Sequence, residues 1–371
     1  MYTKNLKTKT ECKSTEIISI LAQNFSGKMN LARIKFFGLF ICALCKVQTV
    51  CYGRVATAFE SGAKTESSLR RIQRFMAEYA LDTDLIARLV FKILPHQPPY
   101  RLIMDRTNWK LGDKNLNVLA LSIAYQGASF PIMILMLDKR GNSNTNERVR
   151  LMNRYIELFG RQTIYCLTAD REFVGEDWMA YLNKSQIRYH IRIRGNFYVY
   201  DPGDPRKKPF KASWMFHRLR CGEHDFSHRI YRVNGQLCYL SASKAKNKDG
   251  IHELQILVSY NNPEEAHQVY RDRWQIETMF RGLKTGGFNM EDTHLTDLDR
   301  MEKLISIVMV AFAWGYIVGL FANQNIKPIR MLKHGRKAKS FFKYGLEIIA
   351  TILLNPLVAM DVDIFKFLSC T

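Results

Sequence analysis

The sequence lacks the signatures of several common enzyme classes. Its 371 residues contain no G-x-S-x-G nucleophile elbow, no Walker loop, no HExxH zinc motif and no GxGxxG fingerprint. The N-terminus lacks the charged and then apolar pattern of a secretory signal, so no signal peptide is predicted. Eight cysteines are scattered, and the Cys42-x-x-Cys45 pair lies in an apolar run without a second ligand pair. These absences argue against serine hydrolases, P-loop enzymes, zinc proteins and a disulfide framework.

Acidic residues are scarce relative to basic ones. The chain has 34 Asp and Glu against 55 Lys and Arg, a formal net charge of +21. The excess is spread out, because residues 1–95 contain 15 basic and 7 acidic residues and residues 201–260 contain 11 and 6. A charge of this size indicates a polyanionic partner, either nucleic acid or an anionic membrane. Because the positive charge is spread along the chain, an extended DNA-binding surface is favoured over a single membrane anchor.

One uncharged run approaches the length of a membrane span. Residues 304–322 include 19 positions without a charge, close to the threshold for a transmembrane helix. The run stands alone and contains Ser306, Gly315 and Gly319. We therefore expect a buried core helix, no membrane partner and a cytoplasmic protein.

Residues 1–95 have a helical pattern. An amphipathic helix is predicted over 65–79, with an apolar face of Leu69, Ile72, Phe75 and Met76. Its other face carries Arg70, Arg71 and Arg74. Together with a preceding short helix, this face is compatible with a helix-turn-helix DNA reader, and equally with a solvated basic surface. Residues 94–99 (LPHQPP) form the clearest linker, because consecutive prolines stop a helix.

An α/β layer with a mixed sheet is predicted over residues 96–194. Strands are expected at 100–104, 117–125, 130–137, 163–168 and 187–193, and helices at 146–159 and 176–183. Residues 195–259 indicate a β-rich insertion, in which Asn234-Gly235 is a strong hairpin signal. Residues 260–325 contain the helix described next. Residues 326–371 are expected to be helical, and their basic stretch 329–345 is either a DNA-backbone patch or a solvated helix.

Three carboxylates stand where a metal site could form. Asp105 and Asp170 each come at or just after the end of a predicted buried strand, although a turn-capping role fits each one taken alone. Glu172, two residues after Asp170, competes with Asp170 as the candidate carboxylate of this segment. Glu277 lies on a predicted helix that could run beside the same sheet edge. Carboxylates converging from two strands and a helix suit Mg²⁺, and two such ions could promote phosphodiester cleavage.

The helix with Glu277 has a polar stripe. Tyr270, Arg273, Glu277 and Lys284 fall within roughly 60° of one another on a regular α-helix, because each residue turns the helix by about 100°. Such a face could hold a metal ion and a nucleic-acid backbone together, or it could be a solvated face with ordinary ion pairs.

These motifs resemble those of the DDE transposases of bacterial insertion sequences with the YREK signature, usually called insertion-sequence family four. The signature Y-x2-R-x3-E-x6-K is matched by Tyr270, Arg273, Glu277 and Lys284. The stretches 105–109 (DRTNW) and 170–173 (DREF) match the two aspartate motifs of the family. The resemblance covers roughly residues 100–345.

The resemblance implies an RNase H-like catalytic domain with a β-rich insertion, and the helical, basic pattern of residues 1–95 indicates an all-α DNA-binding domain before it. The resemblance also implies a transposase that cuts double-stranded DNA at the terminal inverted repeats of its element and joins the ends to target DNA. Asp105, Asp170 and Glu277 would bind Mg²⁺, with Mn²⁺ as an alternative, while Tyr270, Arg273 and Lys284 would hold phosphates. Trp214 is a candidate for stacking on a flipped base, or else an ordinary core or surface residue. A homodimer on paired ends is expected; the alternatives are a catalytically inactive protein that only binds the repeats, or a non-transposing nuclease.

Overall fold

The computed structural model describes residues 14–111, 114–204, 206–246, 250–293, 295–355 and 362–369. The chain divides into two compact units, of which unit 1 combines Met1–Pro95 with Arg281–Thr371 and unit 2 is His96–Phe280. The break after Pro95 falls within the predicted linker. Residues 1–95 and the C-terminal region, which the sequence treats as separate segments, are therefore grouped in one unit.

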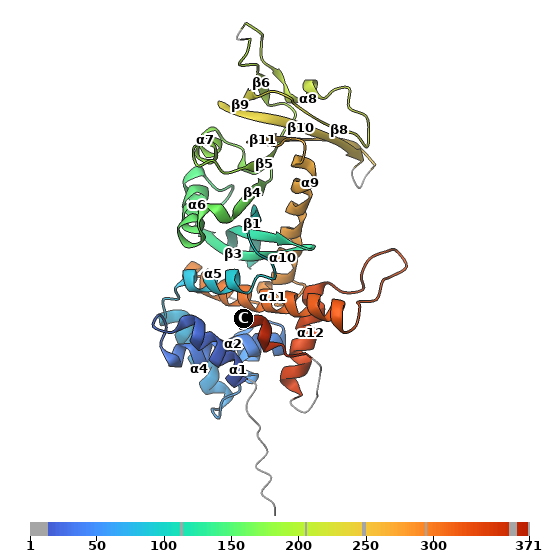
Figure 1. Cartoon of the computed structure of the whole chain (residues 1–371). Coiled ribbons are helices and arrows are strands. Elements are labelled where there is room, and N and C mark those ends of the chain that lie inside the picture. The colour runs from blue at the N-terminus through green and yellow to red at the C-terminus, as the bar shows by residue number, and fades with distance from the viewer. Residues whose placement is uncertain are drawn as a thin grey trace, which may run out of the picture. The chain divides into compact units, whose positions relative to one another are not determined.

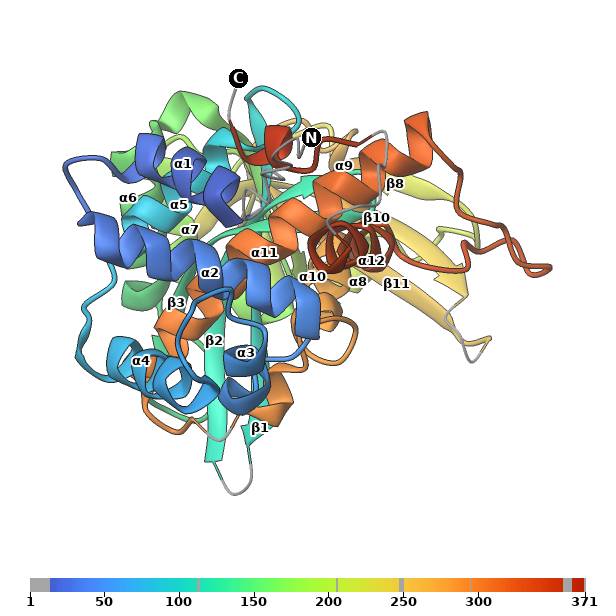
Figure 2. The ribbon, with the colours of Figure 1, turned by 90° about the horizontal axis from the view of Figure 1, so that it is seen from below.

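Unit 1 is helical in its described residues. The long helix α11 contacts α2, α4, α5 and α12, and α2 and α12 can be seen beside it in Figures 1 and 2. The helices are α1 (Ser14–Phe25), α2 (Leu31–Val47), α3 (Tyr52–Thr57), α4 (Thr65–Glu78), α5 (Thr83–Lys92), α11 (Leu298–Asn325) and α12 (Phe341–Leu354). By length and composition α11 is the one helix among the described residues that could cross a membrane. However, 94% of its apolar 18-residue stretch is buried inside the protein. In this structure α11 is the core helix of unit 1.

Glycines allow α11 and α12 to approach closely. A Cβ atom added to Gly319 would lie 1.8 Å from the carbonyl oxygen of Phe341, and one added to Gly345 would lie 1.8 Å from that of Gly315. Such distances are impossible for real atoms, so the two backbones pack at a separation that only glycine permits.

Unit 2 is built on one mixed sheet. Its strand order is β3-β2-β1-β4-β5-β11-β10-β9-β6-β7, with β8 also paired to β10. The strands near the predicted site are β1 (Tyr100–Leu111), β2 (Lys114–Tyr125), β3 (Ala128–Leu137), β4 (Ile164–Ala169) and β5 (Tyr189–Ile193). The pairs β1–β4 and β4–β5 are parallel, whereas β2 is antiparallel to both β1 and β3.

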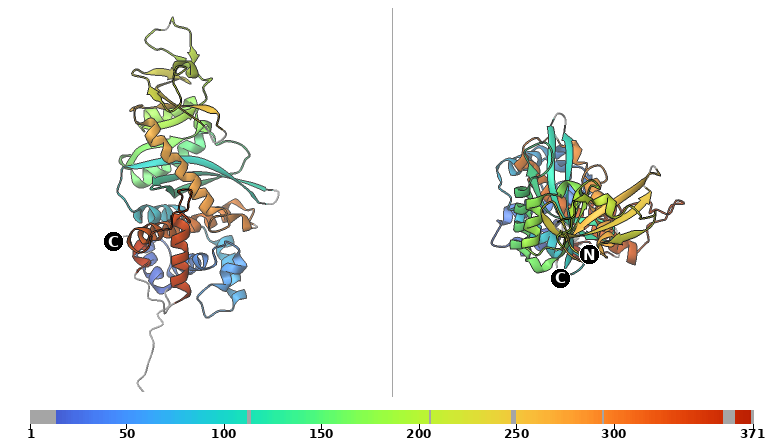
Figure 3. Two further views of the ribbon diagram at one scale, coloured as in Figure 1. Left: turned by 90° about the vertical axis from the view of Figure 1, so that its right-hand side faces the viewer. Right: turned by 90° about the horizontal axis from the view of Figure 1, so that it is seen from above.

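Helices lie on both faces of this sheet. Helices α6 (Thr145–Phe159) and α7 (Glu176–Lys184) are on one face, and the segment from α9 (Ala266–Tyr270) to α10 (Gln275–Leu283) is on the other (Figures 1 and 3). Helix α9 contacts β5, β10 and β11, and the 3-10 turn η3 (Arg271–Trp274) contacts β2. The segment therefore crosses the sheet, and it passes the parallel strands that precede the predicted aspartates.

The β-rich region after residue 195 continues the central sheet. It comprises β6 (Tyr198–Tyr200), β7 (Phe210–Lys211), β8 (His224–Phe226), β9 (Tyr231–Val233), β10 (Gln236–Lys246) and β11 (His252–Ser259), with the short helix α8 (Ala212–Met215). Strand β11 pairs antiparallel with β5 from Ile256↔Ile193 to Ser259↔His190. Asn234 and Gly235 both have positive φ at the predicted β9–β10 hairpin turn. Unit 2 is accordingly a single compact unit without a break at the start of this region.

Two predicted elements differ from the structure. Strand β1 does not end at Asp105, because the β1–β2 hairpin continues from Asp105↔Ala120 to Leu111↔Lys114. The basic stretch 329–345 is not one helix, because α12 begins only at Phe341 and the residues before it form a turn with an isolated bridge, Met331↔Lys337. Gly335 has φ +79° in that turn, a conformation that ends helical structure.

Candidate active site

The two aspartates lie at the same level on neighbouring parallel strands. The β1–β4 pairing runs to Met104↔Ala169; Asp105 is the next residue of β1, and Asp170 directly follows the end of β4. Although β1 continues along β2, its pairing with β4 stops where Asp105 begins. Two carboxylates are thereby placed side by side at the carboxyl ends of the β1–β4 pairing, where open α/β sheets bind ligands.

Asp105 is held in a buried, polar environment. Burial raises the pKa of Asp105 from 3.8 to about 6, against the opposing effects of Arg273 and the Arg106 backbone N–H. The negative charges of Asp170 and Glu172 raise the pKa of Asp105 further. A carboxylate that is costly to ionise here would gain from a cation.

The segment that carries the polar stripe is not one regular α-helix. Residues Arg271–Trp274 form a 3-10 turn between α9 and α10, so the helix turns more tightly there, by about 120° per residue. Tyr270 is 2% exposed and packs with Leu257 and Ala266. Tyr270 and Arg273 are therefore buried against the sheet and do not form an open polar face. Ile276, Met279 and Phe280 are buried, as the apolar pattern predicts.

Arg273 links Asp105 to Glu277. Its Nη1 donates to Asp105 Oδ2 at 2.9 Å, and its Nη2 is 3.6 Å from Glu277 Oε1. Burial by itself lowers the pKa of Arg273, but Tyr270, Asp105, Asp170 and Glu277 together raise it. Its Nε is buried and has no hydrogen-bond partner within the described ranges. The guanidinium thus neutralises the carboxylates and keeps one donor unused.

A second arginine fixes the loop beside the aspartates. Arg106 donates from Nε and Nη2 to the two carboxylate oxygens of Glu172, at 3.1 Å each. It also donates to Asn117 Oδ1 at 3.1 Å, and Arg148 Nη2 donates to the Glu172 backbone oxygen at 3.0 Å. Glu172 is therefore the partner of Arg106. Sequence reasoning assigned no role to Arg106, although its position directly after Asp105 was the available signal.

The donor set is suitable for a hard divalent cation. Asp105 and Asp170 offer adjacent carboxylates, and carboxylate oxygens are what Mg²⁺ and Mn²⁺ prefer. In the part of the chain that the structure describes, however, no group of three His, Cys, Asp or Glu side chains is placed to hold a metal ion. Arg273 pairs with both Asp105 and Glu277 in this structure.

The other predicted site residues belong to unit 1 or to helix α8. Lys284 directly follows α10 and belongs to unit 1, as do the exposed side chains of Arg70, Arg71 and Arg74 on α4. Arg71 and Arg74 line a cavity of about 260 Å³ together with Arg33 and aromatic residues of α2 and α4. Trp214 is on α8 and is 61% exposed, so it is not a core residue.

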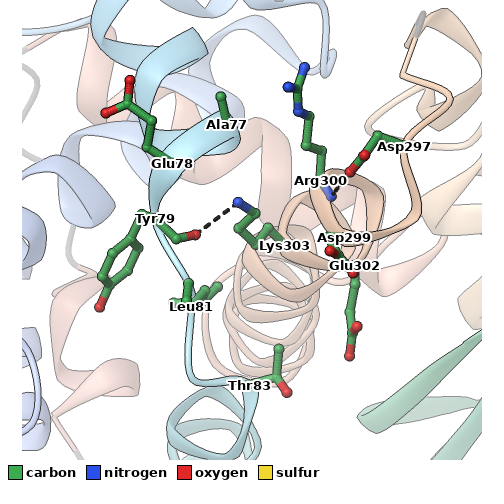
Figure 4. Close-up of a pocket in the computed structure, with 11 residues that line it drawn as sticks. Ala77, Glu78, Tyr79, Leu81, Thr83, Asp297, Asp299, Arg300, Glu302 and Lys303 are labelled. Carbon is green, nitrogen blue, oxygen red and sulfur yellow. Dashed lines mark hydrogen bonds between the residues drawn. The ribbon is translucent and has the colours of Figure 1, made fainter.

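A separate hollow of unit 1, of about 400 Å³, is lined mainly by acidic and polar residues (Figure 4). Lys303 Nζ donates there to the backbone oxygen of Tyr79 at 2.8 Å and to that of Met76. Both acceptors lie at the C-terminal end of α4, where carbonyl groups have no helical partner. With Glu78, Asp297, Asp299 and Glu302 in its lining, the hollow does not suit a polyanion, and Lys303 acts as a helix cap.

Comparison with known proteins identifies the family. A family model described as a transposase DDE domain matches residues 96–314, more than half of the chain. The solved structures include a cryo-EM structure of a piggyBac transposase synaptic complex with hairpin DNA. It is similar with a TM-score of 0.43 and 12% sequence identity, and the similarity covers 97% of this chain and 81% of that one. No curated protein matches the sequence. The chain belongs to the transposase DDE domain family.

Proposed function

We propose that this member of the DDE transposase family cuts DNA at the ends of its element and joins those ends to target DNA. Hydrolysis of one phosphodiester bond would free a 3′-hydroxyl group. The oxygen of that hydroxyl would then attack a target phosphodiester, forming one P–O bond as another breaks. The observation that carries the proposal is the placement of Asp105 and Asp170 at the end of the β1–β4 pairing, with Asp105 linked through Arg273 to Glu277.

We assign Asp105, Asp170 and Glu277 as ligands of Mg²⁺, with Mn²⁺ as an alternative. Such ions, when bound, would supply charge stabilisation to the attacking and leaving oxygens. Glu277 has a side chain that is 42% exposed and can approach the aspartates once Arg273 releases it. Arg273 is assigned to a DNA phosphate by the matched signature. Tyr270 and Lys284 are assigned to phosphates by the matched signature alone.

We further propose that β1–β5 form an RNase H-like core and that the protein is an insertion-sequence transposase of the YREK type. The strand order β3-β2-β1-β4-β5, with an antiparallel hairpin followed by parallel strands, supports the first part. The complete match of Tyr270, Arg273, Glu277 and Lys284 supports the second.

The DNA partners would be the terminal inverted repeats and the target duplex, and the protein would act as a homodimer in the bacterial cytoplasm. The net charge of +21 supports a DNA partner. Arg70, Arg71 and Arg74 are exposed together on α4, which is compatible with reading or holding DNA. The exposure of Trp214 leaves it accessible for stacking on a base.

We expect Glu277→Ala to abolish divalent-dependent nicking of end DNA while DNA binding persists, because Glu277 would act on the cleavage step. The substrate is a labelled duplex carrying the repeats that flank the gene, with nicking followed on denaturing gels and binding by fluorescence anisotropy. Glu264→Ala, which removes an exposed acid just before α9, is the matched control and should cut normally.

Normal nicking by Glu277→Ala would remove Glu277 from the site. If the parent protein binds the repeats but cuts none of them with Mg²⁺ or Mn²⁺, the alternative of an inactive, repeat-binding protein replaces our proposal.

A further inference from the structure

The segment between α11 and α12 concentrates positive charge on an ordered turn. We define it as the cationic hairpin, residues 326–340. It contains six Lys and Arg residues and no Asp or Glu, at Lys327, Arg330, Lys333, Arg336, Lys337 and Lys339. A charge run of this kind on an unstructured loop would be an ordinary solvated surface. Here, however, the backbone is organised.

Backbone hydrogen bonds fold the segment into a short two-stranded ribbon. Ala338 N donates to Arg330 O at 2.8 Å, Leu332 N donates to Arg336 O at 2.8 Å, and Met331 bridges Lys337. The turn closes with Gly335 N donating to Leu332 O at 2.9 Å. The charged side chains therefore project from a defined backbone.

The base of the hairpin is attached to the helices on either side. Ile329 N donates to Asn323 Oδ1 of α11 at 2.9 Å, and Tyr344 OH of α12 donates to Lys327 O at 3.0 Å. Lys339 Nζ pairs with Glu347 at 2.5 Å. Another cation, Lys337, lies over the Phe341 ring at 3.9 Å. These contacts engage the side chains of Lys337 and Lys339, whereas Lys327 contributes only its backbone oxygen.

Three further cations of the hairpin remain available. Arg330, Lys333 and Arg336 are exposed, and none forms a salt bridge within the described ranges. Their neighbour Met331 is 56% exposed. No Phe, Tyr or Trp occurs in the hairpin, so it lacks the aromatic platform on which single-stranded bases stack.

We propose that the cationic hairpin is a contact for duplex DNA, in which Arg330, Lys333 and Arg336 bind backbone phosphates independently of sequence. The major groove of duplex DNA, about 12 Å wide, admits a two-stranded ribbon. Because the base of the hairpin is attached to α11 and α12, less conformational entropy is lost on binding. The inference rests on the proposed transposase function, because it takes DNA as the partner.

The test measures binding of the full chain to an arbitrary duplex in EDTA, by fluorescence anisotropy over a range of NaCl concentrations. We expect Arg330→Gln/Lys333→Gln/Arg336→Gln to reduce the slope of log K against log salt by about 2.7, because each phosphate contact contributes about 0.9. Its affinity deficit relative to the parent should shrink about 40-fold between about 50 and 200 mM salt. Circular dichroism and thermal unfolding would establish that the variant is folded.

Two controls isolate the hairpin. Arg330→Lys/Lys333→Arg/Arg336→Lys keeps the charges and should keep the parent slope. Lys28→Gln/Arg150→Gln/Lys184→Gln removes three exposed cations elsewhere. It should change the slope by less than about 0.9, which is the contribution of one phosphate contact.

An unchanged slope in the hairpin variant, or an equal loss in the charge-matched control, overturns the proposal. Loss of binding to phosphatidylserine vesicles without a change in the DNA slope would assign the hairpin to a membrane surface instead. Either result leaves the cleavage assay with Glu277→Ala intact, so failure of the hairpin and failure of the proposed function are distinguishable.

Discussion

At the scale of residues, two arginines organise the acidic cluster of unit 2. Arg273 pairs with Asp105 and Glu277, and Arg106 donates a hydrogen bond to each carboxylate oxygen of Glu172. The side chains of Arg106 and Glu172 are 11% and 19% exposed, so little water competes for their charges. Because Arg106 follows Asp105 and Glu172 lies two residues after Asp170, this pair ties the two aspartate-bearing segments together.

We expect Arg106→Ala to lower the free energy of unfolding by about 2–4 kcal/mol, because it leaves a largely buried carboxylate without its partner. Glu172→Gln and the double variant complete a double-mutant cycle measured by urea unfolding. The coupling energy should be about 1–3 kcal/mol, as for residues in direct contact. Additive effects of the two substitutions would show that the pair does not tie the segments together.

At the scale of elements, the close packing of α11 on α12 depends on glycine. We expect Gly345→Ala to lower the free energy of unfolding by about 1–3 kcal/mol, because its Cβ would overlap the Gly315 carbonyl and force the helices apart. Thermal unfolding monitored by circular dichroism measures the change. Gly62→Ala is a matched control, since a Cβ there meets nothing within 4 Å. Equal stability of Gly345→Ala and the parent would contradict the tight contact.

At the scale of the whole molecule, buried histidine makes stability depend on pH. His190 is 0% exposed, and its Nδ1 lies 2.8 Å from Ser259 Oγ. Burial lowers the pKa of His190 from 6.5 to about 4; nearby Glu265 opposes this shift, and Arg188, His267 and Arg101 add to it. The unfolded chain therefore takes up a proton near pH 6.5, whereas the folded chain takes it up only near pH 4.

Stability should consequently fall as the pH drops from 6.5 toward 4, by at most about 1.4 kcal/mol per pH unit from this group. Asp105 acts in the opposite direction, because its raised pKa of about 6 favours folding once the carboxyl is protonated. Comparing the parent with His190→Gln at pH 7 and pH 5 by urea unfolding separates the contribution of His190 from that of Asp105. The variant should lose less stability at pH 5 than the parent, and an equal loss would remove His190 as the cause.

The sequence alone located most of the strands and helices of the α/β layer, but not the order of the strands in the sheet. Alternating and continuous apolar runs predicted β2, β3, β4, β5 and the helices between them, because hydrophobic periodicity is a local property. The sequence also predicted a linker over residues 94–99, within which the division between the two units falls, and the hairpin turn at Asn234-Gly235, where residue type dictates backbone conformation.

Only the tertiary structure decided which charges meet. Whether Arg273 faces solvent or Asp105 depends on a 3-10 turn and on the sheet beneath it, and a helical projection of the sequence contains neither. The continuation of β1 past Asp105 depends on its pairing with β2, and the joining of β11 to β5 depends on an edge more than 60 residues away in sequence. Residue type thus indicated which carboxylates are candidates for the site, whereas long-range pairing determined that Arg273 meets Asp105 and Glu277.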